Sequence, residues 1–270
     1  MIKTAITSSI VPQARQGPFV FHDDLPASII KIGQLGFDAI EIFPPSANAI
    51  DVSQIQKMTA DANLKVAAVG TGAGFVVYKL TLSDPDPAAR LRAVNFVKEI
   101  IDIAGALGAP AIIGSMQGRH PEGQRDASLS PLAESLETLG THARQYKVPL
   151  LYEPLNRYET NLFNRQGEAA DWLRGQRLQN IKILADLFHM NIEEVDVAGA
   201  LRQVGDLLGH VHFVDSNRRA CGLGHTDFTP IVRALHDIKY EGYASAECFP
   251  FPDSESAAKQ TIDAYHSVFN

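Results

Sequence analysis

The chain has 270 residues, of which 45% are hydrophobic and 20% are charged, and this composition is typical of a globular protein. Its formal net charge is −7 and its longest basic cluster is the pair Arg218 and Arg219, so a nucleic-acid partner is disfavoured. No apolar run approaches the roughly 18 residues of a membrane span, and the N-terminal apolar run is too short for a signal peptide. We therefore expect a cytoplasmic enzyme without a membrane partner.

Short apolar runs alternate with amphipathic helical patterns along the whole chain. In chain order, the apolar runs predict strands over residues 3–8, 39–43, 65–69, 109–114, 148–153, 181–186, 210–215 and 243–248. Helical spacing of apolar residues predicts helices between them, one over residues 91–104 and the others centred near Ile30, Ile55, Leu136, Ala170, Leu201, Ile231 and Tyr265. Asp51 and Ser83 are candidate helix caps, and the glycine-rich residues 70–74 are expected to form a loop.

This order of elements is typical of one fold class. Strands that alternate with helices indicate parallel βαβ units, and eight units in about 250 residues are typical of the (β/α)8, or TIM, barrel. We therefore predict an α/β fold in which residues 1–270 form a single TIM-barrel domain. The alternative is a doubly wound open sheet, which usually binds its ligand at a glycine-rich turn after the first strand. The loop after the first predicted strand lacks that fingerprint, and "GTGAG" at residues 70–74 does not match it.

Polar residues stand at or near the ends of four consecutive predicted strands: Glu153, Asp186, His212 and Glu247. Because the active site of a TIM barrel lies at the C-terminal ends of its strands, we expect these side chains to converge. Three carboxylates in a dry pocket need a compensating charge, and a divalent cation would supply it. An oxygen-rich set with one nitrogen favours Mn²⁺, Mg²⁺ or Co²⁺ over zinc. Taken singly, each acid also suits a helix cap or an ion pair, and His212 suits a buried core position.

Two further polar residues lie within the predicted strands. Glu41, in "AIEIF", is interpreted as an inward-pointing structural acid. His210 shares a strand face with His212, because side chains two residues apart project alike, so we expect it one layer deeper in the barrel.

Several segments of the second half resemble those of a known family. They are "EPLNRYETN", "ADLFHMNIEE", "HVHFVDSNR", "GLGHTDF" and "AECF", and they are similar to the sugar isomerase/epimerase group of xylose-isomerase-like barrels. Within that group, the D-tagatose 3-epimerase and D-psicose 3-epimerase branch is the most similar. The resemblance implies one divalent metal ion, with Mn²⁺ favoured, held by Glu153, Asp186, His212 and Glu247. It also implies that Glu153 and Glu247 act as the acid/base pair, and that the O1 and O2 end of the substrate is held by Glu159, His189 and Arg218.

The reaction implied is epimerisation of a keto-sugar by an isomerase. One carboxylate would remove a proton next to the carbonyl to give an enediolate, and the other would return a proton to the opposite face. Return of the proton to the neighbouring carbon would instead make the protein an aldose–ketose isomerase, and the sequence does not separate these outcomes. Barrels of this group are often homo-oligomers, so an oligomer is compatible with the sequence.

The loop "GSMQGRH" at residues 114–120 departs from the epimerase pattern, which tends to have an aromatic or apolar residue here. Gln117 and Arg119 are polar and are candidate contacts for the far end of the substrate. An arginine at this place suits a carboxylate, a phosphate or extra hydroxyls, so a keto-acid sugar, a keto-glycoside or a sugar phosphate competes with a free hexulose. The plain alternative is a solvated loop.

Three other functions compete with epimerisation or isomerisation. An inosose-dehydratase-like lyase also begins with proton removal beside a carbonyl, but its product loses water. A metal-dependent hydrolase of the endonuclease type would need more metal ligands and a DNA-binding surface. A non-catalytic sugar-binding protein would bind its ligand without turnover.

Overall fold

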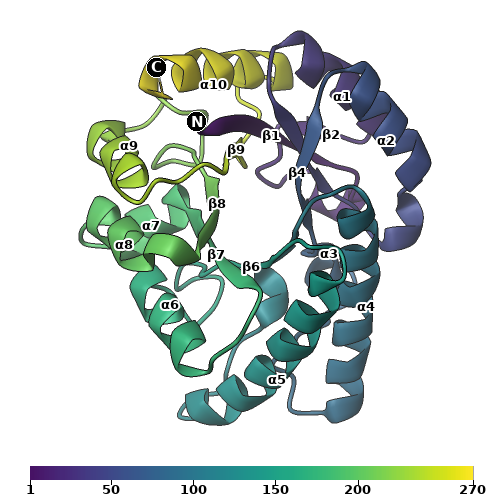
Figure 1. Cartoon of the computed structure of the whole chain (residues 1–270), viewed down its shortest axis with the longest axis vertical. Coiled ribbons are helices and arrows are strands. Elements are labelled where there is room, and N and C mark those ends of the chain that lie inside the picture. Colours follow the sequence, from purple (N-terminus) through teal and green to yellow (C-terminus); the bar gives the residue numbers. More distant parts are fainter. Residues whose placement is uncertain (270) are drawn as a thin grey trace.

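Eight parallel strands close into a barrel in the computed structural model of the chain, which describes residues 1–269 (Figure 1). In chain order they are β1 Lys3–Ser9, β3 Ala39–Phe43, β4 Lys65–Gly70, β5 Ala111–Ile113, β6 Leu150–Tyr152, β7 Ile181–Asp186, β8 Leu208–His212 and β9 Tyr243–Ala246. Each pairs with the next, and β1 also pairs with β9, which closes the barrel. The short strand β2 (Phe21–His22) pairs with the end of β1. The predicted TIM-barrel fold is therefore confirmed.

Helices connect the strands and surround the barrel (Figure 1). The predicted helices correspond to α1 Leu25–Gln34, α2 Val52–Asp61, α4 Pro87–Ala106, α5 Arg125–Arg144, α6 Gln166–Gly175, α8 Val197–Val204, α9 Phe228–Asp237 and α10 Ser254–Phe269. Two further short helices are α3 (Ala73–Val76) after β4 and α7 (Leu187–Glu193) after β7, so the loop predicted at residues 70–74 runs into a helix. Within residues 1–269, no helix combines the length and apolar character that crossing a membrane requires.

Aspartates begin several of these helices. The predicted cap Asp51 accepts a hydrogen bond from a backbone N–H in the first turn of α2. The prediction for Ser83 is wrong, because Ser83 is buried and Asp86 accepts the first-turn hydrogen bonds of α4 instead. Pro87 explains the difference: proline suits the first helical position, which makes the residue directly before it the cap.

The strand bounds differ from the predicted ones near the C-terminal ends. β8 ends at His212 rather than at residue 215, and β6 and β9 stop one residue before Glu153 and Glu247. Phe213 and Val214 are fully buried although they lie beyond β8. Phe213 packs against Phe228 of α9 and Tyr265 of α10, so apolar packing continues past the last strand hydrogen bond and the hydrophobic pattern overestimates the strand.

The barrel interior is lined in layers. A layer of buried apolar side chains is formed by Phe19, Phe43, Ala68, Ile112, Leu151 and Leu184. Glu41 of β3 also points inward, as expected, and both His210 and His212 of β8 reach it. Val211, between the two histidines, packs outward with the main core. Alternation along β8 therefore sends two imidazoles into the barrel and an apolar side chain toward the helices.

Candidate active site

Four consecutive strands bring four polar side chains together at the C-terminal end of the barrel. Glu153 follows β6, Asp186 ends β7, His212 ends β8 and Glu247 follows β9, and all four are buried. The Nδ1 atom of His212 lies 3.3 Å from Asp186 Oδ2, 3.6 Å from Glu153 Oε1 and 3.7 Å from Glu247 Oε2. The convergence expected from the strand-end pattern is therefore present.

Asp186 is held in place by the helix that follows it. Its Oδ1 atom accepts a hydrogen bond of 2.8 Å from the backbone N–H of Phe188, in the manner of a helix N-cap at the start of α7. This contact leaves Oδ2 facing His212. The two oxygens of one carboxylate thus have separate tasks, one structural and one directed into the site.

The carboxylates lie close together, and all three are buried. Burial raises the pKa of Glu153 well above its ordinary value, and the nearby charges of Glu247 and Asp186 raise it further. Burial also raises the pKa of Glu247, against the lowering effect of Arg218. Among residues 1–269, Glu153 Oε1 finds no hydrogen-bond partner. A buried oxygen without a partner beside two other acids fits a bound cation, because the cation would relieve both the repulsion and the desolvation.

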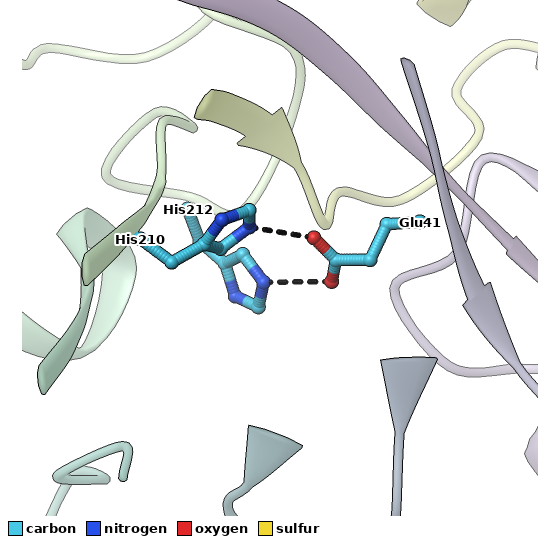
Figure 2. A group of neighbouring side chains, drawn as sticks. All are labelled: Glu41, His210 and His212. Atoms are coloured by element: carbon cyan, nitrogen blue, oxygen red, sulfur yellow. Dashed lines mark hydrogen bonds and ion pairs between the residues drawn. The ribbon is translucent and has the colours of Figure 1, made fainter. Parts of the chain in front are cut away.

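Within the described residues, two groups of three buried side chains have the spacing of a metal site, and they share His212. One is Glu153, Asp186 and His212, and the other is Glu41, His210 and His212. In the second group the Nε2 atoms of both rings already lie 2.7 and 2.9 Å from the oxygens of Glu41, which are hydrogen-bond distances (Figure 2). The three side chains of the second group therefore already hydrogen-bond one another, and the first group is the better metal site.

His189 directs a hydrogen-bond donor toward the carboxylates of the site. The backbone N–H of Asn156 donates to its Nδ1 atom at 3.3 Å, so the proton of the neutral ring lies on Nε2. Burial lowers the pKa of His189 to about 4, which keeps the ring neutral near pH 7. The Nε2 atom lies 3.7 Å from Asp186 Oδ2 and has no hydrogen-bond partner in the described part of the chain. The Asn156 side chain also donates to Glu159 at 3.0 Å, which links two of the predicted substrate contacts.

Arg218 lies on the loop after β8, and its side chain contacts the acids. Its guanidinium hydrogen-bonds Glu247 and lies 3.6 Å from Asp186 Oδ2 and 3.8 Å from Glu159 Oε1. The Phe188 ring lies against it, with 4.8 Å between the guanidinium carbon and the ring centroid. The φ angle of Arg218 is +57°, a left-handed conformation that is uncommon for an arginine. The fold therefore holds a permanent cation beside the carboxylates.

The two residues predicted for the far end of the substrate lie in different environments. Gln117 is fully buried: its amide donates to the backbone oxygens of Gly114 and Glu153, and its Oε1 accepts from the Tyr152 hydroxyl. The structure does not support a substrate contact for Gln117, because its amide is used to hold the end of β6. Arg119 is exposed and donates to a backbone carbonyl of the loop after β6 at 3.1 Å.

Sequence analysis missed three residues of this site: Asn156, Phe188 and Gly114. Asn156 lies inside the quoted segment "EPLNRYETN", and the question of what orients His189 would have drawn attention to it. Phe188 directly precedes His189 and reads as an ordinary apolar residue. Gly114 has no side chain to signal a role, and its importance depends on a neighbour distant in sequence.

Gly114 leaves room for the carboxylate of Glu153, and Gly114→Ala tests this. A Cβ atom at position 114 would lie 2.6 Å from Glu153 Oε2, so the carboxylate would have to move. We expect a loss of about 10–100-fold in divalent-metal affinity, measured by calorimetry with MnCl₂, with the fold intact. The control is Gly175→Ala, where a Cβ atom meets nothing within 4 Å. Equal affinity in both variants would show that Glu153 tolerates displacement.

The chain is similar to known proteins over most of its length. Residues 30–267 match the family described as Xylose isomerase-like TIM barrel. The chain is 32% identical over 254 residues to a D-psicose 3-epimerase of Ruminiclostridium cellulolyticum, covering 90% of this chain and 83% of that protein. It is 29% identical over 241 residues to a 3-dehydro-D-guloside 4-epimerase of Escherichia coli, covering 86% and 90%. The solved structure of a D-psicose 3-epimerase with D-tagatose from Clostridium cellulolyticum superposes with a TM-score of 0.82 at 23% identity, covering 100% of both chains. The chain therefore belongs to the xylose isomerase-like TIM barrel family.

Proposed function

We propose that the protein is a metal-dependent isomerase that epimerises a keto-sugar, or a derivative of one, at a carbon next to the carbonyl. The observation that carries this proposal is the convergence of three buried carboxylates on His212, with an unpartnered oxygen on Glu153 among residues 1–269. The relatives support the reaction class, because the D-psicose 3-epimerase and the 3-dehydro-D-guloside 4-epimerase are both sugar epimerases.

Glu153, Asp186, His212 and Glu247 would hold one divalent cation. Carboxylate oxygens with a single imidazole nitrogen favour Mn²⁺, with Mg²⁺ or Co²⁺ as alternatives. When bound, the cation supplies Lewis acidity that stabilises negative charge on the substrate oxygens. Glu247 also hydrogen-bonds Arg218 through Oε2, the oxygen that faces His212, so its carboxylate would serve the guanidinium and the cation together.

Glu153 and Glu247 serve as the acid/base pair. They come from β6 and β9, with two strands between them, so they approach the substrate from different directions. One carboxylate takes the proton from the carbon beside the carbonyl, which leaves an enediolate, and the other carboxyl gives a proton to the opposite face. Burial raises the pKa of each group above its ordinary value, which suits groups that must both accept and release a proton.

Glu159, His189 and Arg218 bind the O1 and O2 end of the substrate. The Nε2–H group of His189 and the guanidinium of Arg218 are donors, and the carboxylate of Glu159 is an acceptor. Arg119 lies on the loop after β5 and binds the far end of the substrate. An arginine there accommodates a keto-glycoside or a carboxylated sugar as well as a free ketose.

We propose that residues 1–270 act as one domain in the cytoplasm on a small sugar, without nucleic acid or a membrane. A homo-oligomer is compatible with this proposal.

Proton exchange in D₂O tests the reaction. The Mn²⁺-loaded protein is incubated with ketoses, keto-acid sugars and keto-glycosides, and each mixture is followed by NMR. We expect deuterium at the carbon beside the carbonyl together with the epimer of the substrate. A product that has lost water would indicate a lyase, and an aldose product would indicate an aldose–ketose isomerase. Binding of a sugar without any exchange would contradict the proposal and favour a sugar-binding protein.

A further inference from the structure

Glu41 makes a contact that spans the barrel interior. It lies on β3 and reaches His210 and His212 on β8, and β1 and β9 separate these strands in the sheet. All three side chains are buried, with exposed fractions of 0–1%. Figure 2 shows the carboxylate facing the two rings, with one oxygen directed at each. Glu41 therefore hydrogen-bonds both rings, and one of them, His212, is also a candidate metal ligand.

The two ring nitrogens of His212 face different side chains. Its Nε2 atom lies 2.9 Å from Glu41 Oε1, while its Nδ1 atom faces Asp186, Glu153 and Glu247. A metal ligand needs an unprotonated nitrogen, so the neutral ring must carry its proton on Nε2. A carboxylate that accepts this N–H fixes both the tautomer and the orientation of the ring. Glu41 Oε1 lies within hydrogen-bond distance of this N–H group.

Glu41 is itself held in one orientation. Its second oxygen, Oε2, lies 2.7 Å from His210 Nε2, so rotation of the carboxylate would break one or both contacts. Glu41 therefore presents one carboxylate oxygen to each ring.

We propose that Glu41 is a positioning residue that presents the Nδ1 atom of His212 to the metal, and that His210 holds Glu41 in the orientation this requires. The inference rests on the proposed function, because it assumes that His212 is a metal ligand. It assigns the Glu41, His210 and His212 group to support of one metal site rather than to a second ion.

Two isosteric substitutions separate positioning from simple packing. Glu41→Gln keeps the volume but removes the charged acceptor from His212. His210→Gln also alters a fully buried contact of Glu41. The amide of the new glutamine keeps an N–H group near the place of His210 Nε2, and the carboxylate of Glu41 stays intact. We expect Glu41→Gln to weaken Mn²⁺ binding by about 10–100-fold and His210→Gln to leave it within about threefold of the unmodified protein. Binding is read from the EPR signal of free Mn²⁺, without substrate, after circular dichroism has shown that each variant is folded.

Each outcome decides the proposal. Equal Mn²⁺ affinity in the Glu41→Gln variant and the unmodified protein would overturn it, and so would equal losses in both variants, since these would indicate packing alone. Two Mn²⁺ ions per chain in the unmodified protein would assign the Glu41 group to a metal site of its own and would also overturn it. Failure of the unmodified protein to bind Mn²⁺ would overturn the inference and the proposed function together. Normal binding without epimerisation would reject the proposed function alone.

The unmodified protein provides a second test that does not depend on the folding of any variant. NMR of the isotope-labelled protein loaded with Mg²⁺ reports which nitrogen of His212 carries the proton. We expect the proton on Nε2 with the downfield shift of a hydrogen bond to a carboxylate. A proton on Nδ1 would overturn the proposal.

Discussion

Glu153→Gln and Glu247→Gln are each expected to reduce kcat by at least about 10²–10⁴-fold while the fold stays intact. Each substitution keeps the volume of the side chain and removes a group that accepts and donates the transferred proton. Each also removes a carboxylate ligand from the candidate metal site, so the Mn²⁺ content of the variants has to be measured beside the rate. Turnover is followed by NMR with the substrate identified by proton exchange, and folding is followed by circular dichroism.

Glu168→Gln is the matched control for this pair. Glu168 forms an exposed ion pair with Arg125, away from the strand ends, so the same chemical change there should leave kcat unchanged. A rate near that of the unmodified protein in either the Glu153 or the Glu247 variant, with Mn²⁺ bound, would reject the paired-carboxylate mechanism. Loss of activity in the Glu168 variant would show that the assay responds to general destabilisation.

Removal of divalent cations with a chelator is expected to abolish turnover, and Mn²⁺ is expected to restore it. Mn²⁺ should also stabilise the fold, because an ion that binds only the folded protein at about 100 times its Kd contributes about 2.7 kcal/mol. For a chain of this size, that corresponds to a rise in Tm of roughly 5–10 °C. Differential scanning calorimetry measures it. Unchanged activity and Tm after chelation would contradict the metal-dependent mechanism.

The stabilisation by Mn²⁺ should grow as the pH rises above about 4.3, the ordinary pKa of a glutamate carboxyl group. Burial raises the pKa values of Glu153 and Glu247, so the folded metal-free protein retains protons that the unfolded chain has lost. The stability of the metal-free protein therefore falls as the pH rises from the ordinary pKa of a glutamate to the raised pKa of these two groups. The cation takes the place of these protons and binds more tightly as its ligands deprotonate. A Tm difference that is constant with pH would show that these groups do not exchange protons for the metal.

The periodicity of the chain was sufficient to predict the barrel and the convergence of four polar side chains at the C-terminal ends of its strands. Apolar runs and helical spacing are local properties, and the rule that active sites lie at the C-terminal ends of barrel strands then selects Glu153, Asp186, His212 and Glu247. Strand ends were predicted less well, because residues such as Phe213 are buried without belonging to a strand. The contact of Gln117 could not be predicted either, because the sequence does not show whether a polar loop residue faces a substrate or the backbone at the end of β6.

The tertiary structure decided how each polar group is oriented. The sequence determined that a histidine ends β8, but the fold decided that its Nε2 lies 2.9 Å from Glu41, which is 171 residues away in the chain, and that its Nδ1 faces the acids. The tautomer of His189 likewise depends on Asn156 from another loop, and the space for Glu153 depends on Gly114. Residue type fixes which hydrogen bonds a side chain can make, whereas the closure of the barrel fixes which partner is within reach.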